Sequence, residues 1–430
     1  MQPLVIAPHG ILQGAFTPPG DKSVSHRAVM FGALSAGKSH YTHFLEAEDC
    51  LNTLKAFRNM GVPIQHVPGS GEITIEGVGL KGLRAPSETI DLGNSGTSIR
   101  LMLGILAGQK FEAILSGDES LAKRPMKRVT QPLKKMGAQI KGKDDGNFTP
   151  LTIRGGKLQG IYFDNKLSSA QVKSALLFAG MQAEGITTIQ ENLPSRDHTE
   201  RFLRACGAKF SQEGNLLKIE KTESLKALQG EVPGDISSAA FFIVGAAMTQ
   251  GSEIKIERVS LNPTRIGLLK VLERMGAKIQ IQQTSEIPEP QGNLLIRGTS
   301  LKGTRIAPEE IPSLIDEIPI LMIAMALAEG ESLISGAAEL RVKESDRLHS
   351  MVSNLKSVGG DADELPDGCI IRGRSEFQGG KVQSYYDHRT VMSFCIGALR
   401  SKNPIEIDDK TSVSTSFPTF FDQLNKLRKR

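Results

Sequence analysis

Hydrophobic and polar positions along this chain follow two recurring patterns. The first is an amphipathic helical stretch closed by a phrase such as LKKMGA or LERMGA, with its glycine at Gly61, Gly137, Gly207, Gly276 and Gly359. The second is an Ala-rich, apolar helical stretch followed by strand-like alternation, with its glycine at Gly37, Gly108, Gly185, Gly251 and Gly330. A sixth copy of the second pattern has Lys402 in place of the glycine. Because the copies recur about every 70 residues, the pattern predicts a six-fold repeat of one small α/β unit.

The first complete unit shows the order of elements that the pattern predicts. Apolar residues at helical spacing predict a helix over 24–35, and alternation predicts a strand over 40–45. A second helix, begun by its Asp, is expected over 49–61, and two alternating runs predict strands over 62–67 and 72–78. Each unit is therefore expected to run helix, strand, helix, strand, strand.

The two helices of a unit differ in how their apolar residues are distributed. The first is apolar on nearly every side, as in PILMIAMALAEG, and such a helix is expected to be buried. The second keeps a charged face and is expected to lie outside. We therefore predict an α/β (α+β) fold of two similar domains. Each domain would hold three repeated αβ units around buried parallel helices, as an inside-out α/β barrel.

A second echo in the chain marks the expected division into halves. The tripeptide Pro-Gly-Asp opens one buried helix at 19–21 and another at 233–235, and residues 211–231 are polar and rich in Lys. We expect one domain over 21–231 and a second built from 1–20 together with 232–430, with the active site in the cleft between them. Two simply sequential domains are the alternative.

The composition belongs to a globular chain of two ordinary domains. The chain has 430 residues, of which 39% are hydrophobic and 23% charged. Neither an apolar run of the ~18 residues that cross a bilayer nor a secretory signal is visible. The four cysteines lie far apart without metal-ligand spacing, which favours reduced thiols and a cytoplasmic location.

The net charge of +5 is spread along the chain rather than gathered in one run. Nucleic-acid binding normally needs a concentrated basic patch and stacking aromatic residues. This chain has no Trp and only four Tyr, so we expect no nucleic-acid partner. A basic excess suits small anionic substrates equally well.

Unusual polar residues stand at the starts of the helices that the repeat makes equivalent. In the first half these starts read DKSVSHR over 21–27, where Ser23 can cap the helix, GNSGTSIR over 93–100 and SSAQVK over 168–173. Helix N-termini attract anions, so three such starts on parallel helices predict an anion site, although each alone is more often a plain cap. In the second half we single out Asp316-Glu317, RVKESDR over 341–347 and YDHR over 386–389. For RVKESDR the simpler interpretation is a solvated charged face.

The segment Gly32–Ser39 matches the phosphate-loop pattern GxxxxGK[ST] letter for letter. A true phosphate loop follows a strand and opens a helix. Here the pattern predicts a helix first and a strand afterwards, so we interpret the match as coincidental and expect no nucleotide.

At PGDKSVSHR, GNSGTSIR, AKRPM, SSAQVKS, RVKESDR and YDHR the chain closely resembles the 5-enolpyruvylshikimate-3-phosphate synthase family, in order and over nearly its whole length. The resemblance implies transfer of the enolpyruvyl group of phosphoenolpyruvate to the 5-hydroxyl of shikimate 3-phosphate, with release of phosphate. It also implies a reaction that uses no metal and no organic cofactor, by a chain that is a monomer with no membrane partner.

The resemblance also implies roles for individual residues. Asp316 would be the base that takes the hydroxyl proton, and Glu344 with Lys22 would donate a proton to the methylene carbon. Shikimate 3-phosphate would be held by Ser23, Arg27, Ser169, Gln171, Ser195 and Lys343. Phosphoenolpyruvate would be held by Lys22, Asn94, Gly96, Arg124, Gln171, Arg347 and Arg389, and the same substrate site would include Thr97, Ala170 and His388.

The chain departs from the family pattern at a few positions. Many relatives carry a lysine shortly before the C-terminal Phe-Pro, but here the nearest is Lys410. Ala170 stands where some members have a second serine. The segments SAQVKS and SRDHTE resemble the branch with reduced glyphosate sensitivity, although Gly96 is not the alanine linked to that trait.

Three alternatives to this function remain. The related UDP-N-acetylglucosamine enolpyruvyl transferases share the repeat but have a reactive cysteine in the loop before their Arg-Pro, and residues 116–125 here contain none. A non-catalytic anion-binding module of the same fold would not need both Asp316 and Glu344. A phosphate-loop nucleotidase comes third.

Overall fold

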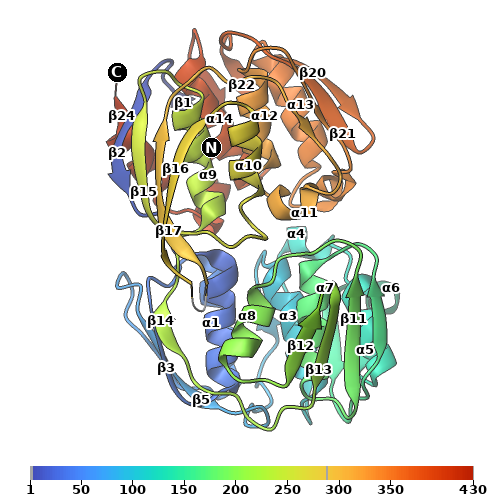
Figure 1. Cartoon of the computed structure of the whole chain (residues 1–430). Helices are drawn as coiled ribbons and strands as arrows, with labels where there is room; N and C mark the ends of the chain where they lie inside the picture. The colour runs from blue at the N-terminus through green and yellow to red at the C-terminus, as the bar shows by residue number, and fades with distance from the viewer. Residues whose placement is uncertain (1–2, 287–288, 430) are drawn as a thin grey trace. The chain divides into compact units, whose positions relative to one another are not determined.

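The computed structural model describes residues 3–286 and 289–429 (Figure 1). Contacts divide the chain into two compact units, which we call the first unit (Gly20–Val232) and the second unit (Met1–Pro19 with Pro233–Arg430). The chain therefore passes between the units twice, after Pro19 and after Val232. Both units mix helices with small sheets, so the predicted α/β class is confirmed.

The first unit contains three copies of the predicted element order. Its apolar helices are α1 (Lys22–Leu34), α3 (Gly96–Ala107) and α7 (Ala170–Gly180), followed by strands β3 (Ala36–Thr42), β7 (Glu112–Ser116) and β11 (Ile186–Glu191). Its outer helices are α2 (Glu48–Asn59), α5 (Lys127–Met136) and α8 (His198–Ala205), with short α4 (Glu119–Ala122) and α6 (Lys143–Gly146) in the second copy. The hairpin strands are β4 (Ile64–His66), β5 (Ile73–Val78), β8 (Gln139–Gly142), β9 (Phe148–Arg154), β12 (Phe210–Glu213) and β13 (Leu216–Glu220).

Each copy builds a four-stranded sheet of the same design. The orders are β14-β3-β5-β4, β6-β7-β9-β8 and β10-β11-β13-β12. In each sheet the first pair is parallel and the other two pairs are antiparallel. The parallel edge strands are β6 (Ile90–Asp91), β10 (Tyr162–Asn165) and β14 (Gln229–Glu231). Because β14 comes from the end of the unit and pairs with β3 near its start, it closes the series of three.

The second unit also places an apolar helix before a strand in each copy, but its sheets among the described residues have five, four and three strands rather than four each. Its apolar helices are α9 (Ile236–Ala247), α12 (Ile318–Ala326) and α14 (His388–Gly397), followed by β15 (Glu253–Ser260), β19 (Glu331–Ile334) and β23 (Ile405–Ile407). Its other helices are α10 (Gly267–Arg274), α11 (Ile311–Leu314), α13 (Arg347–Ser357) and α15 (Phe420–Leu427), with 3-10 turns η1 (Ala338–Val342), η2 (Ala398–Arg400) and η3 (Thr411–Thr415). The remaining strands after Val232 are β16 (Lys278–Ser285), β17 (Gln291–Arg297), β18 (Arg305–Ile306), β20 (Asp361–Leu365), β21 (Gly368–Arg372), β22 (Gly380–Val382) and β24 (Arg428–Lys429).

The N-terminal segment supplies two strands to the second unit. Strand β2 (Ile11–Phe16) lies between β15, to which it is parallel, and β24, to which it is antiparallel. Strand β1 (Leu4–Ile6) pairs antiparallel with β23, with Leu4 opposite Ile407. Two sheets of this unit are therefore built from segments at opposite ends of the chain.

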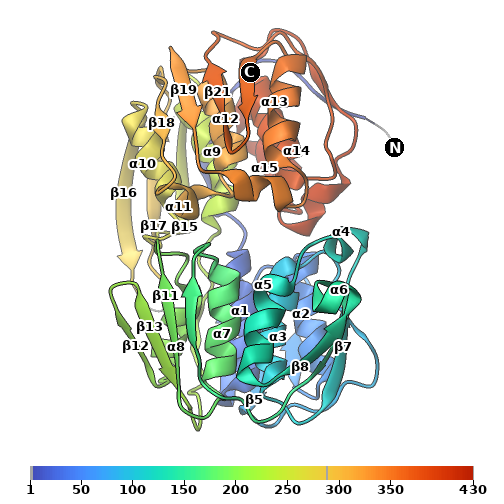
Figure 2. The same ribbon diagram turned by 90° about the vertical axis from the view of Figure 1, so that its right-hand side faces the viewer.

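The apolar helices of the first unit run in the same direction (Figure 2). Near their starts, Gln171 of α7 donates to the hydroxyl of Thr97 of α3 at 3.1 Å. Beyond their ends, Gln182 donates to the carbonyl of Ile105 at 3.0 Å. The two helices also approach closely, because a Cβ at Gly104 would lie 2.1 Å from the carbonyl oxygen of Ala175. Glycine is therefore required at this crossing.

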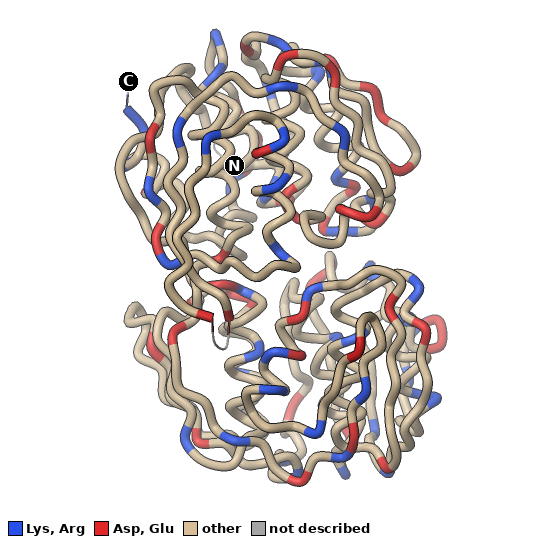
Figure 3. The backbone as a smooth tube through the Cα atoms, in the orientation of Figure 1, with Lys and Arg blue, Asp and Glu red and all other residues tan. Residues whose placement is uncertain are grey.

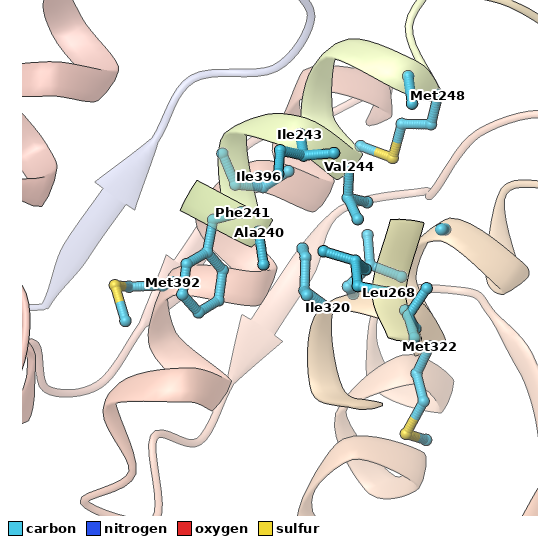
Figure 4. Close-up of a cluster of buried hydrophobic side chains, with 14 of the residues drawn as sticks. Ala240, Phe241, Ile243, Val244, Met248, Leu268, Ile320, Met322, Met392 and Ile396 are labelled. Carbon is cyan, nitrogen blue, oxygen red and sulfur yellow. The ribbon is translucent and has the colours of Figure 1, made fainter. Parts of the chain in front are cut away.

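The same parallel arrangement occurs in the second unit. Figure 4 shows its core, where α9, α10, α12 and α14 contribute Ala240, Phe241, Ile243, Val244, Met248, Leu268, Ile320, Met322, Met392 and Ile396. At the C-terminal ends of these helices, Arg400 donates to the carbonyls of Met248 and Leu327 at 3.1 and 2.9 Å. At the N-terminal ends, Arg389 of α14 donates to the carbonyl of Asp316, just before α12, at 2.8 Å.

Two predicted helix starts are wrong in detail. Ser23 does not cap α1, because Asp21 is the N-cap and accepts from the Val24 N–H at 3.0 Å. Asp49 does not begin α2, which starts at Glu48 after Ala47, and its carboxylate is used in an ion pair instead. The first predicted strand also begins earlier, at Ala36, since ladder pairing with β5 extends back to that residue.

The segment that matches the phosphate-loop pattern has the predicted reverse order. Helix α1 ends at Leu34, and the Gly-Lys-Ser part lies in β3. This order is the reverse of that in a true phosphate loop, as predicted. Within the described parts of the chain, none of the helices combines the length and hydrophobicity needed to cross a membrane.

Candidate functional site

Lys22 opens α1 and forms an ion pair with a carboxylate of the neighbouring helix. Its Nζ lies 3.0 Å from Asp49 Oδ2, and the two side chains are 24% and 10% exposed. The ammonium group therefore remains accessible to a ligand while Asp49 fixes its direction. Because both side chains are mostly buried, breaking this pair would leave a largely buried carboxylate without this cation.

The glycine-rich turn before α3 lies against two arginine side chains. Arg124 donates to the side-chain oxygen of Asn94, and also to Ser120 Oγ at 3.3 Å. Gly96 is not in the left-handed backbone region, and a Cβ there would lie 3.1 Å from Arg100 Nη1 and 3.2 Å from Arg124 Nη1. The missing side chain thus leaves two guanidinium groups facing the backbone of a helix start, which is a setting suited to anions.

Gln171 links the starts of α3 and α7. Its side-chain oxygen accepts from Arg100 Nη1 at 2.5 Å, while its amide nitrogen donates to Thr97 at 3.1 Å. Arg100 also donates to the carbonyl of Pro125 at 3.1 Å. Since Pro125 follows Arg124 in the chain, Arg100 connects three of the predicted site segments.

Arg27 is buried and ties α1 to α7 and α8. Its Nε donates to Thr199 Oγ1 at 2.7 Å and its Nη2 to Ser174 Oγ at 3.0 Å. Its Nη1 donates to the Ser23 carbonyl at 2.9 Å. The guanidinium is thus held in one position by its own helix and by two neighbouring helices.

The remaining predicted residues of the first unit lie at the start of α7 and in the loop before α8. Ser169 is the N-cap residue of α7 without a side-chain cap bond, and Ala170 is the first helical residue. Ser195 donates its hydroxyl to Glu191 Oε1 at 2.5 Å. The starts of three parallel helices of the first unit therefore carry Lys22, Asn94, Thr97, Ser169 and Gln171.

In the second unit, one buried arginine gathers three carboxylates. Arg347 is the first residue of α13, and its Nε lies 2.8 Å from Asp387 Oδ2. Its Nη1 lies 3.3 Å from Asp316 Oδ1, and its Nη2 is hydrogen-bonded to Glu344. Burial opposes the charge, but the carboxylates of Asp387, Glu344 and Asp316 raise the pKa of Arg347 further above its ordinary value. This group, which we call the carboxylate–arginine cluster, therefore keeps a fixed positive charge at its centre.

The carboxylates of this cluster differ in how far water reaches them. Asp387 is fully buried, and although burial opposes its ionisation, Arg347 holds the pKa of Asp387 below its ordinary value. The side chains of Asp316 and Glu344 are 16% and 24% exposed. Asp387 can thus act only as support, whereas Asp316 and Glu344 can meet a ligand and exchange protons with it.

Further predicted residues surround the cluster. Lys343 is partly buried, and loss of hydration lowers the pKa of its ammonium group against the opposing effect of Asp316. Arg389 contacts the Asp316 backbone, as described above, and its own N–H bonds Asp387 Oδ1 at 2.9 Å. His388 is the first residue of α14 and is 5% exposed.

The segment RVKESDR divides into a solvated part and a buried part. Arg341 pairs with Asp346 and Glu364, each at 2.8 Å, and all three side chains are partly exposed. Arg347 is only 2% exposed. The interpretation as a solvated face therefore holds for Arg341 and is wrong for Arg347. Over the chain as a whole, basic and acidic residues are interspersed in both units (Figure 3).

Sequence reasoning missed the residues that hold these side chains in place. Asp49, Arg100 and Asp387 contact Lys22, Gln171 and Arg347 respectively. Arg100 and Asp387 stand within motifs already singled out, GNSGTSIR and YDHR, so their position was the available signal. Lys410 lies 5.4 Å from the centre of the Phe421 ring. Within residues 3–286 and 289–429, no three His, Cys, Asp or Glu side chains are grouped so that they could hold a metal ion.

Known proteins resemble this chain along its full length. The model of the family described as EPSP synthase (3-phosphoshikimate 1-carboxyvinyltransferase) matches residues 6–424. Curated proteins named 3-phosphoshikimate 1-carboxyvinyltransferase are 49% identical in Bacillus cereus (strain G9842) and 48% identical in Bacillus subtilis (strain 168). These alignments cover 97% of this chain in both cases, and 97% and 98% of the two relatives.

A solved structure agrees with this assignment. The EPSP synthase of Acinetobacter baumannii, solved at 2.37 Å, superposes with a TM-score of 0.89 and 47% sequence identity. The superposition covers 99% of this chain and 98% of that one. The resemblance inferred from the motifs is thus confirmed by sequence and by fold, and this chain belongs to the EPSP synthase (3-phosphoshikimate 1-carboxyvinyltransferase) family.

Proposed function

We propose that this chain transfers the enolpyruvyl group of phosphoenolpyruvate to the 5-hydroxyl of shikimate 3-phosphate and releases phosphate, in the shikimate pathway. The observation that carries the proposal is the family match over residues 6–424. The residues at the first unit's helix starts and in the carboxylate–arginine cluster support it. A reaction between two polyanions needs several fixed cations together with accessible carboxylates.

Shikimate 3-phosphate binds at the first unit's helix starts and through Lys343. Serine hydroxyls, the Arg27 guanidinium and free backbone N–H groups are suited to a phosphate dianion. Its ligands are Ser23, Arg27, Ser169, Ala170, Gln171, Ser195 and Lys343. Arg27 needs little rearrangement for this role, since contacts within α1 and with α7 and α8 already hold it.

Phosphoenolpyruvate binds to residues at the first unit's helix starts and around the carboxylate–arginine cluster. Arginine suits this ligand because its planar fork grips phosphate and carboxylate groups with two parallel hydrogen bonds. The ligands are Lys22, Asn94, Gly96, Thr97, Arg124, Gln171, Arg347, His388 and Arg389. This proposal includes the expectation that these two groups of residues act on the same pair of substrates.

The reaction proceeds by addition and then elimination. Asp316 takes the proton of the 5-hydroxyl as the oxygen attacks the carbon that bears the phosphate, while Glu344 with Lys22 protonates the methylene carbon to a methyl group. The carbon–oxygen bond to phosphate then breaks, the methyl group returns a proton to the same donor pair, and the proton held by Asp316 leaves with the phosphate. The products are the enolpyruvyl ether and inorganic phosphate, so atoms and charges balance.

Calorimetry combined with a phosphate-release assay tests this function. We expect shikimate 3-phosphate to bind alone, phosphoenolpyruvate to bind more tightly in its presence, and phosphate to be released only with both. Release with UDP-N-acetylglucosamine as acceptor would favour the related transferase, and binding without turnover would favour the anion-binding module. A nucleotidase would instead bind ATP. A monomeric chain, the absence of a nucleic-acid partner and a cytoplasmic location remain predictions.

A further inference from the structure

A buried ionic group on and beside α7 in the first unit contains none of the ligands or catalytic residues proposed above. It consists of Lys173, Glu191 and Glu200, whose side chains are 1%, 3% and 1% exposed. The Lys173 ammonium lies 2.8 Å from Glu191 Oε2 and 2.6 Å from Glu200 Oε1. Buried ion pairs of this kind are often no more stabilising than apolar residues of the same volume, so stability alone does not account for the group.

The two carboxylates of the group differ in their surroundings. Burial raises the pKa of the Glu200 carboxyl, and Lys173 only partly opposes that shift. Burial also disfavours the Lys173 ammonium, but Glu200 and Glu191 raise its pKa above the ordinary value. Lys173 is therefore a permanent cation whose charge is directed at Glu191 and Glu200.

Glu191 accepts hydrogen bonds from donors on every side. Its Oε1 accepts from the Ser195 hydroxyl at 2.5 Å and from Asn165 Nδ2 at 3.2 Å. Its Oε2 accepts from Lys173 Nζ at 2.8 Å and from the Ser195 N–H at 3.4 Å. Asn165 and Glu191 stand opposite each other where the parallel strands β10 and β11 end. Both oxygens are thus committed to fixing neighbouring segments.

The segment that carries Ser195 has no regular structure of its own. Residues 192–197 lie between β11 and α8 without helix or ladder bonds. Ser195 is held through its hydroxyl and N–H by Glu191, and through its carbonyl by Lys173 Nζ at 3.2 Å. Contacts with Glu191 and Lys173, rather than backbone ladder bonds, therefore fix the position of Ser195.

The same carboxylate reaches Ser169 through one intermediate. The Asn165 side chain accepts from the Ser169 N–H at 3.2 Å and donates to the Ser169 carbonyl at 3.2 Å. Because Asn165 also donates to Glu191, the backbone positions of Ser169 and Ser195 both depend on the Glu191 carboxylate.

We propose that Glu191 is a positioning residue that holds Ser169 and Ser195 in the relative arrangement needed to grip the phosphate of shikimate 3-phosphate. This inference rests on the proposed function, which makes both serines ligands of that phosphate. Glu200 also pairs with Lys173, but its carboxylate oxygens accept no hydrogen bond from either serine, so it has no such role.

Replacement of Glu191 by glutamine tests the inference with minimal change in size. The Lys173 ammonium, the Asn165 amide nitrogen and the Ser195 N–H can only donate, whereas the Ser195 hydroxyl can also accept. If the glutamine NH2 takes the place of Oε1, Asn165 loses its acceptor and the Ser195 hydroxyl has to turn and accept from the amide. If it takes the place of Oε2, it opposes Lys173 and the Ser195 N–H. In each case a contact that fixes Ser195 is lost or reversed.

We expect Glu191→Gln to raise the Kd of shikimate 3-phosphate roughly tenfold in calorimetry, since a charge-assisted contact is lost. The kcat at saturating substrate and the KM of phosphoenolpyruvate should stay near the wild-type values. Glu200→Gln is the matched control, because it also removes a carboxylate from Lys173, and it should leave the Kd within about twofold. In a Ser195→Ala background, Glu191→Gln should have a much smaller effect.

Each outcome of this experiment decides the inference. Equal Kd values for Glu191→Gln and wild type, or equal changes for Glu191→Gln and Glu200→Gln, would show that the group is only structural. A wild-type chain that does not bind shikimate 3-phosphate would overturn the proposed function and this inference together. A normal wild-type affinity with an unaffected Glu191→Gln variant would overturn the inference alone.

Discussion

Arg347 and Asp387 form an ion pair inside the second unit, with Nε and Oδ2 2.8 Å apart and side chains that are 2% and 0% exposed. The pair joins the first residue of α13 to the N-cap of α14. Because the other two guanidinium nitrogens contact Asp316 and Glu344, the direction of this one side chain determines where both accessible carboxylates lie. We therefore expect Asp387 to support the proposed chemistry through Arg347, without touching a substrate.

Replacement of Asp387 by asparagine should destabilise the chain in a pH-dependent manner. At pH 7 we expect a loss of about 3 kcal/mol in the free energy of unfolding, because a buried charge loses its partner. Although burial opposes ionisation, Arg347 holds the pKa of Asp387 below its ordinary value, so the stabilising effect is complete well above the unfolded pKa of about 3.9 and disappears as the pH falls through the lower folded value. Urea unfolding of both proteins should thus give a constant difference from pH 7 to 5. A difference already lost at pH 5 would contradict the prediction.

Replacement of Asp316 by asparagine should separate catalysis from binding. The amide keeps the size of the side chain but cannot take the proton of the attacking hydroxyl, so kcat should fall by about 10²- to 10⁴-fold. The Kd of shikimate 3-phosphate should change little, which is the pattern of an interaction made in the transition state. Glu364→Gln, at a partly exposed carboxylate beside Arg341, is the control and should keep full rate. A collapse of affinity with the rate preserved would make Asp316 a binding residue only.

Replacement of Lys22 by methionine should abolish turnover while the fold survives. Lys22 is 24% exposed and Asp49 only 10%, so loss of the pair leaves a largely buried carboxylate without this cation, and the Tm should fall by about a few degrees while cooperative unfolding is kept. Lys38→Met is a matched control within the segment that resembles a phosphate loop, and both its turnover and its Tm should be normal. Near-normal turnover of the Lys22 variant would remove this residue from the site, and inactivity of the Lys38 variant would reopen the nucleotide hypothesis.

Replacement of Gly96 by alanine should discriminate between glyphosate, the family's inhibitor, and phosphoenolpyruvate. The added methyl group would lie 3.1 and 3.2 Å from the ends of Arg100 and Arg124, which leaves less room for the longer inhibitor. We expect its inhibition constant to rise about tenfold more than the KM of phosphoenolpyruvate.

A control exists within the same turn. Gly93 has a φ of +54°, and a Cβ there would lie 2.7 Å from Asn52 Nδ2, so Gly93→Ala should lower the Tm. Gly96 is outside the left-handed region, and its alanine variant should keep a normal Tm. Equal weakening of both ligands together with a lower Tm for Gly96→Ala would show that this glycine serves only the turn.

The repeat and its buried helices could be predicted because they depend on local composition. An apolar surface on every side of PILMIAMALAEG permits only a buried helix, whichever partners cover it. Very short strands could not be predicted in this way, because β6 and β18 have two residues each and no detectable alternation. Their pairing depends on neighbouring strands that the sequence pattern does not identify.

The residues that support the site could not be predicted from local sequence patterns either. An aspartate near a helix start is usually a cap, and only the packing of α2 against α1 brings Asp49 to Lys22. Glu191 ends a strand as an ordinary polar residue would, and its contacts come from three other segments of the chain. Ligand-facing residues lie in recognisable motifs, whereas the groups that orient them are distributed by tertiary structure.

The insertion of the first unit between β2 and α9 imposes an order on synthesis at the ribosome. Strands β1 and β2 emerge first, but their partners β23 and β15 follow only after the whole first unit has been translated. The nascent chain must therefore carry two strands without these partners while the whole first unit is synthesised. Unpaired strand edges attract unwanted pairing, and here they stay open until the ribosome has delivered Glu253 and then Ile405.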